Sequence, residues 1–168
     1  LDKQAALADC RLEWHFIGPI QSNKTRPIAE HFSWVHSIDR LKIAERLSEQ
    51  RPAGLPPLQV CIEVNVSGEA SKGGVTPADL PALADAVASL PRLRLRGLMA
   101  IPAPSADIAA QRAAFRQVHA AFDRLVAHGH ALDTLSMGMS ADLEAAILEG
   151  ATIVRVGTAL FGERIYPR

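Results

Sequence analysis

The sequence has little cysteine and no long hydrophobic segment, and both absences exclude protein classes. Cys10 and Cys61 are the two cysteines, and neither stands in a CxxC or cysteine–histidine spacing that binds zinc. We therefore expect two reduced, buried thiols rather than a disulfide framework. No segment approaches the ~18 apolar residues of a membrane helix, and no signal peptide opens the sequence. These features predict a soluble cytoplasmic protein without a membrane partner.

An excess of charge of one sign is lacking as well. The 18 basic residues balance the 18 acidic ones, so no overall field draws the protein onto nucleic acid. The six histidines show no HExxH-like spacing, and no metal site is expected. The 168 residues, 48% of them hydrophobic, suffice for one core, and residues 1–168 are expected to form a single domain. Its partner should be a small molecule or another protein.

Short apolar segments alternate with longer amphipathic ones along the whole sequence. The short segments predict strands and the longer ones helices. This order is typical of parallel strands joined by crossover helices. The expected strands are 14–18, 34–38, 59–66, 95–101, 134–137 and 152–157, and the expected helices are 1–11, 26–31, 39–50, 77–90, 106–128 and 141–149.

Two α/β arrangements fit that order, an open doubly wound sheet and an eight-stranded barrel. No GxGxxG motif opens a helix, as the dinucleotide-binding doubly wound folds require. Polar clusters follow almost every expected strand instead of marking one switch point, for example at 21–24 and 138–140. The sequence therefore favours a TIM-like (β/α)8 barrel.

The strongest local signal is SMGMS followed by ADLEAAI, in which a strand ends in a glycine turn and Ser140 stands where a helix N-cap is expected. Unpaired amide groups and the positive end of a helix dipole bind a phosphate without a basic side chain. The alternative is that Ser140 only caps its own helix. Asp142, Glu144 and Glu149 on that helix are expected to face solvent.

A second signal is RVGTA, which places Gly157 and Thr158 just past the last expected strand. A glycine lets backbone amides approach an anion, and in barrels the loops after the last two strands lie side by side. Arg155 is unusual because an unpaired guanidinium inside a strand costs several kcal/mol. It needs a partner in the barrel mouth, and the alternative is a structural ion pair with an acidic residue.

These motifs, together with WHFIGPIQSNK (14–24), VNVSGEASKGG (64–74), LRGLMAIP (95–102) and IVRVGTALFG (153–162), resemble the pyridoxal 5′-phosphate (PLP) homeostasis proteins between residues 11 and 166. That family shares the barrel of the alanine racemase N-terminal domain and binds PLP without an established turnover. The resemblance implies that Arg155 faces the pyridine nitrogen and that Ser140, Gly157 and Thr158 hold the phosphate. We also expect Asn65, Ser136 and Met99 around the cofactor.

The resemblance also implies a departure from the family pattern. In the family a Schiff-base lysine ends the first barrel strand, upstream of the segment that matches WHFIG. We therefore expect this chain to lack about the first two strands and that lysine, and no catalytic residue is assigned. Lys24 and Lys72 follow expected strand ends, and they are interpreted as groups that attract anions rather than as the cofactor lysine.

A guanidinium beside the pyridine nitrogen keeps that nitrogen unprotonated, which makes the ring a weak electron sink. Tyr166 is the one tyrosine, and no second domain is expected to supply a racemase base. The sequence thus favours a PLP carrier or buffer, with PLP-dependent apoenzymes as its recipients. Two alternatives stay open: a PLP-dependent amino-acid racemase or lyase, and a barrel enzyme that binds a sugar phosphate without PLP.

Overall fold

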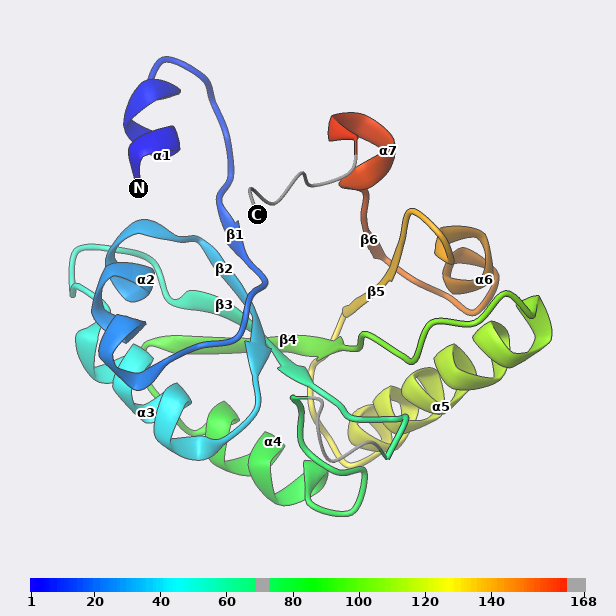
Figure 1. Ribbon diagram of the computed structural model, residues 1–168. Helices are drawn as coiled ribbons and strands as arrows, with labels where there is room; N and C mark the ends of the chain where they lie inside the picture. Colours follow the sequence, from blue (N-terminus) through cyan, green and yellow to red (C-terminus); the bar gives the residue numbers. More distant parts are fainter. Residues whose placement is uncertain (69–72, 163–168) are drawn as a thin grey trace.

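The computed structural model describes residues 1–68 and 73–162, and its strands and helices alternate. Figure 1 shows their arrangement. The strands are β1 (His15–Phe16), β2 (Trp34–Ile38), β3 (Leu58–Glu63), β4 (Leu93–Met99), β5 (Thr134–Met139) and β6 (Ile153–Arg155). The helices are α1 (Asp2–Ala6), the 3-10 turn η1 (Ser22–Lys24), α2 (Thr25–His31), α3 (Leu41–Gln50), α4 (Leu80–Ala88), α5 (Ile108–Ala127), α6 (Leu143–Leu148) and α7 (Thr158–Phe161).

The six strands form one sheet in the order β1-β2-β3-β4-β5-β6, and every neighbouring pair is parallel. A doubly wound sheet reverses its strand order at a switch point, whereas a barrel keeps the order of the chain. Figure 1 shows a curved sheet with α2 to α6 around its outer side. The expected barrel architecture is therefore confirmed for the strands that the structure describes.

The strands divide their side chains between two different environments. Val60 and Ile62 of β3 pack in the large core between the sheet and the helices. Cys61, between them in sequence, belongs to a separate cluster with Trp34 and Met99. Because successive strand residues point to opposite faces, this second cluster lies on the inner side of the curved sheet. In barrels of this kind, functional sites lie where this inner side meets the carboxyl ends of the strands.

Several expected boundaries change because local hydrogen bonds compete with the helix. The expected helix at 77–90 begins at Leu80, since Thr76 Oγ1 accepts a hydrogen bond from the Asp79 amide at 3.2 Å and forms a turn first. The N-terminal helix ends at Ala6 instead of residue 11. Strand β2 has the predicted bounds, and it is buried throughout.

Two expectations about exposure are wrong. Cys61 is a buried thiol as predicted, but Cys10 is exposed because it follows the short α1 outside the core. Glu149 does not face solvent; it is buried, and its carboxylate accepts hydrogen bonds from Arg112 at 2.6 Å and Arg116 at 3.2 Å on α5. Within residues 1–68 and 73–162, no helix is long and apolar enough to cross a membrane.

Candidate functional site

Arg155, the last residue of β6, extends its guanidinium across two neighbouring strands. Nη1 donates to the carbonyl oxygen of Ser136 at 2.6 Å and to its hydroxyl at 2.7 Å, and Nη2 donates to the carbonyl oxygen of Ala100 at 2.9 Å. The partners are therefore neutral oxygens, and no ion pair is formed with the acidic residues that the structure describes. Nε is buried and has no hydrogen-bond partner among the described residues.

The charge of Arg155 is balanced at longer range. Burial lowers the pKa of the guanidinium, and the nearby carboxylates of Asp142 and Glu63 oppose that shift. Burial and the like charge of Asp39 raise the pKa of Glu63, while Arg155 acts in the opposite direction. An arginine stays protonated under such shifts, so the inner face keeps one fixed positive charge at the carboxyl ends of the strands.

Ser140 lies between β5 and α6 and contacts the segment after β6. Its hydroxyl oxygen accepts a hydrogen bond of 3.4 Å from the Ala159 amide, in the first turn of α7. The expectation that Ser140 is the N-cap of the next helix is wrong. That helix begins at Leu143 with Asp142 as its N-cap, and Asp142 Oδ1 accepts from the Met139 amide at 2.6 Å. Ser140 is consequently free of its own helix and joins two loops.

The segment after β6 was expected to be a loop, but it is the short helix α7, which begins at Thr158 with Gly157 as N-cap. An ideal Cβ built on Gly157 meets no atom within 4 Å, so open space adjoins this backbone. Gly157, Thr158 and Ala159 are exposed. The structure thus brings the loops after β5 and β6 together beside an open surface.

The remaining expected site residues lie on the inner face or at strand ends. Met99 and Ser136 are fully buried. Asn65 follows β3, and its side-chain oxygen accepts a hydrogen bond from the Gly68 amide at 3.0 Å. Lys24 lies apart from these residues and lines an outer cavity with Phe16 and Phe32. Lys72 and Tyr166 lie outside the described residues.

Two histidines on the inner face, His15 and His36, were not predicted as part of the site from the sequence. His36 Nδ1 lies 2.7 Å from Ser136 Oγ, and His36 Nε2 lies 2.9 Å from His15 Nδ1. The His15 ring stacks on Trp34 with ring centroids 5.2 Å apart. Burial, His15 and Arg155 lower the pKa of His36 to about 4. The signal was the pattern WVHSI, in which Trp34 and His36 are two residues apart and share one strand face.

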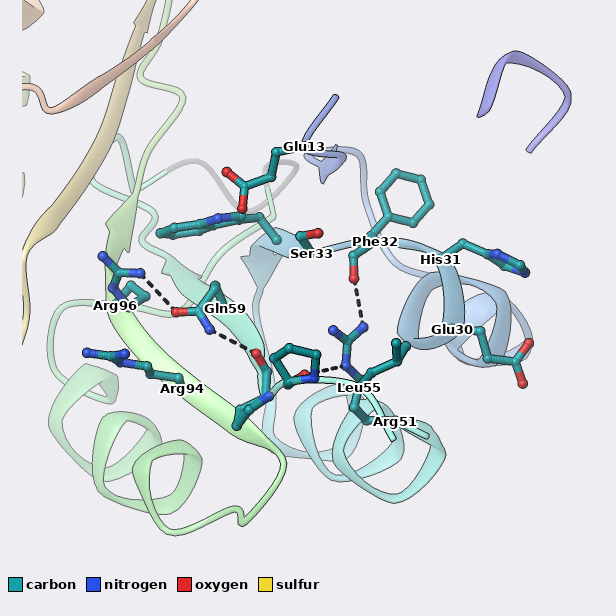
Figure 2. A pocket seen from close by; sticks show the side chains of 13 residues that line it. Glu13, Glu30, His31, Phe32, Ser33, Arg51, Leu55, Gln59, Arg94 and Arg96 are labelled. Carbon is teal, nitrogen blue, oxygen red and sulfur yellow. Dashed lines mark hydrogen bonds between the residues drawn. The ribbon is translucent and has the colours of Figure 1, made fainter. Parts of the chain in front are cut away.

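A cavity of about 620 Å³ opens at the other end of the sheet, and Figure 2 shows the side chains that line it. Trp34, Gln59 and Arg94 come from the beginnings of β2, β3 and β4, so this cavity lies at the amino ends of the strands. Arg96 donates to Gln59 at 2.9 Å and lies 4.7 Å from the centre of the Trp34 ring. This cavity is therefore separate from Ser140 and Arg155.

The chain is similar in sequence to proteins of known family. The family model described as "Alanine racemase, N-terminal domain" matches residues 4–165. A pyridoxal phosphate homeostasis protein of Pseudomonas aeruginosa is 73% identical over 166 residues, which are 99% of this chain and 71% of the relative. Its counterpart in Escherichia coli K12 is 60% identical over 157 residues, covering 94% of this chain and 67% of the relative.

Solved structures give the same result. PipY of Synechococcus elongatus, determined with PLP bound, superposes with a TM-score of 0.87 at 39% identity, covering 96% of this chain and 76% of PipY. An alanine racemase of Clostridium difficile matches with a TM-score of 0.73 at 14% identity, covering 99% of this chain and 44% of the racemase, and shows the fold alone.

The sheet and the matched model define an alanine racemase N-terminal-type barrel domain. Within that class, the chain belongs to the family of pyridoxal phosphate homeostasis proteins. It spans 66 to 71% of the length of the first three curated relatives.

Proposed function

We propose that this chain binds PLP and takes part in PLP homeostasis as a carrier or buffer of the cofactor. The phosphate lies at the loops after β5 and β6, and the pyridine ring faces Arg155. Support comes from the names of the relatives and from the PLP bound to PipY. The recipients are PLP-dependent apoenzymes, and the cytoplasm is where the chain acts.

The observation that carries this proposal is the unpaired Nε of Arg155. Two of the three guanidinium nitrogens are held by Ser136 and Ala100, which fixes the group in one orientation. The third nitrogen, Nε, is a buried donor without a partner among the described residues, and such a group is costly unless it is used. An unprotonated pyridine nitrogen is an acceptor that suits it. The residues present therefore fit the ring of the cofactor.

The phosphate end fits as well. The Ser140 hydroxyl and the amides at Gly157 and Thr158 supply neutral donors, and the absence of atoms around an ideal Gly157 Cβ leaves room for an anion to approach the backbone. Asn65, Ser136 and Met99 border the ring from the neighbouring strands.

Arg155 also favours a protein that binds PLP over an enzyme that uses PLP in a reaction. When bound, PLP supplies an electron sink, and this sink is weak as long as its ring nitrogen carries no proton. A guanidinium holds its protons and donates a hydrogen bond without transferring the proton. The relatives' names favour neither the racemase or lyase alternative nor the sugar-phosphate enzyme.

Calorimetric titration of the purified chain with PLP, pyridoxal and inorganic phosphate tests the proposal. We expect PLP to bind more tightly than pyridoxal, and inorganic phosphate to compete with it. Ser140→Ala should weaken PLP binding about fivefold through the loss of one hydroxyl contact. Ser89→Ala, at the exposed C-terminal end of α4, should have no effect. Equal affinity for PLP and pyridoxal, or no binding of PLP, would refute the phosphate site.

A further inference from the structure

A continuous row of polar groups runs along the inner face from Arg155 to Glu13. Figure 2 shows Glu13 among the side chains that line the cavity. Ser136 Oγ lies 2.7 Å from Arg155 Nη1 and 2.7 Å from His36 Nδ1. His36 Nε2 lies 2.9 Å from His15 Nδ1, and His15 Nε2 lies 3.4 Å from Glu13 Oε2. Glu13 lines the cavity at the amino ends of the strands.

When both imidazoles are neutral, the chemistry of the two ends fixes the direction of every hydrogen bond in this row. A guanidinium only donates, so Ser136 Oγ accepts from Arg155. A carboxylate only accepts, so His15 Nε2 carries the proton that faces Glu13. In a neutral His15 the other nitrogen, Nδ1, is then an acceptor, and it receives the proton of His36 Nε2.

The same rule leaves His36 Nδ1 without a proton. Burial, His15 and Arg155 keep this ring neutral by lowering the pKa of His36 to about 4. Its bare Nδ1 accepts the hydroxyl proton of Ser136, and the lone pairs of Ser136 Oγ are then turned toward Arg155. With the opposite tautomer, His36 Nδ1–H and Arg155 Nη1–H would both donate to Ser136 Oγ, and the hydroxyl proton would have no acceptor within this row.

We propose that His36 is a positioning residue for Arg155, acting as the Nε2–H tautomer through Ser136 to hold the guanidinium in the orientation that leaves Nε available. The effect on PLP rests on the proposed function, but the tautomer does not. His36 touches neither the ring nor the phosphate in this scheme. Its influence should therefore reach the pyridine end of the cofactor and spare the phosphate end.

The first test reads the tautomer directly in the full chain. Long-range ¹H–¹⁵N spectra of ¹⁵N-histidine-labelled protein at about pH 8, where imidazoles are ordinarily neutral, are expected to show His36 protonated at Nε2 and bare at Nδ1. A His36 protonated at Nδ1 would overturn the proposal. This outcome is independent of any ligand, so it separates a failure of the positioning role from a failure of the proposed function.

The second test uses variants with PLP and inorganic phosphate as separate probes. His36→Leu should weaken PLP about tenfold and leave inorganic phosphate unchanged, because a charge-assisted contact is loosened only at the ring end. His36→Asn, which keeps an acceptor near Nδ1, should restore most of the affinity. His128→Leu, at the exposed end of α5, is the matched control. Equal weakening of both ligands would refute a positioning role.

Ser136→Ala completes a double-mutant cycle. If His36 acts through Ser136, the double variant should bind PLP about as weakly as either single variant. Affinities that multiply, to a loss of about a hundredfold, would show that the two side chains act independently and would overturn the proposal.

Discussion

The guanidinium of Arg155 donates from Nη2 to the carbonyl oxygen of Ala100 at 2.9 Å, although Ala100 follows β4 and Arg155 ends β6. Ser136, on β5 between them, accepts from Nη1 with both its carbonyl and its hydroxyl oxygen. One side chain thus ties three strands together from inside the curved sheet.

Replacing Arg155 with lysine is therefore expected to lower stability and PLP affinity together. An ammonium offers no planar set of donors for three acceptors, and one or two carbonyl groups lose their partners. We expect the free energy of unfolding in urea to fall by about 1–3 kcal/mol. Arg124→Lys, on the exposed side of α5, should change neither quantity. An unchanged unfolding curve for Arg155→Lys would contradict the role of the three bonds.

His36 should make stability depend on pH. Its pKa is about 4 in the folded chain against an ordinary value of 6.5, so between these values the unfolded chain binds the proton and the folded chain does not. The contribution of neutral His36 to the free energy of unfolding is fully present above about pH 6.5. It is lost as the pH falls toward 4, and the total loss is roughly 3 kcal/mol.

Urea unfolding measured between pH 7 and about pH 4 checks this dependence, since the slope of stability against pH counts the protons taken up on unfolding. The His36→Asn variant removes the titrating group, and its stability should fall less over the same range. Identical pH profiles for the two proteins would show that His36 does not titrate as described.

The Gly157→Ala substitution should weaken phosphate binding and leave the stability of the fold unchanged. An added Cβ meets no protein atom within 4 Å, so stability is expected to change little. The same methyl group would occupy space that the phosphate needs, and the affinity for PLP and for inorganic phosphate should fall about tenfold. Gly54, whose Cβ also meets nothing, provides the control Gly54→Ala. Unchanged affinity of the Gly157→Ala variant for both ligands would show that the phosphate binds at another place.

The Gly97→Ala substitution, in contrast, should lower the stability of the sheet. Gly97 pairs with Thr134 between β4 and β5, and an added Cβ would overlap the Thr134 carbonyl oxygen. The strands must separate, at a cost of roughly 3 kcal/mol. Thermal unfolding should therefore shift down by several degrees, and wild-type stability in this variant would show that the pairing adapts.

The two thiols are expected to react at very different rates. Cys10 is exposed, whereas burial raises the pKa of Cys61 to about 12 and keeps it as a thiol. Because the thiolate is the reactive form, Ellman's reagent should label one thiol per native chain rapidly and the second only on unfolding. The Cys10→Ser variant should lose the fast phase, and rapid labelling of both thiols would contradict the packing around Cys61.

The sequence by itself determined the order of the strands and the barrel class, because hydrophobic periodicity is local and the motifs around SMGMS and RVGTA are specific. It also predicted, through the resemblance of its motifs to a known family, that Ser140, Arg155, Gly157 and Thr158 belong to one site. It misplaced the N-cap of α6 and missed α7, since short helices depend on competing turns that a pattern does not resolve.

Only the tertiary structure decided which polar groups meet inside the sheet. His36 and Ser136 are 100 positions apart, yet parallel pairing and the curvature of the sheet bring Nδ1 and Oγ to 2.7 Å. No local pattern encodes that distance, because it depends on the register and twist of the four strands from β2 to β5. The row of polar groups from Arg155 to Glu13 therefore exists only in the folded sheet. The same holds for the burial of His36 and for the hydrogen-bond partners of the groups in the row.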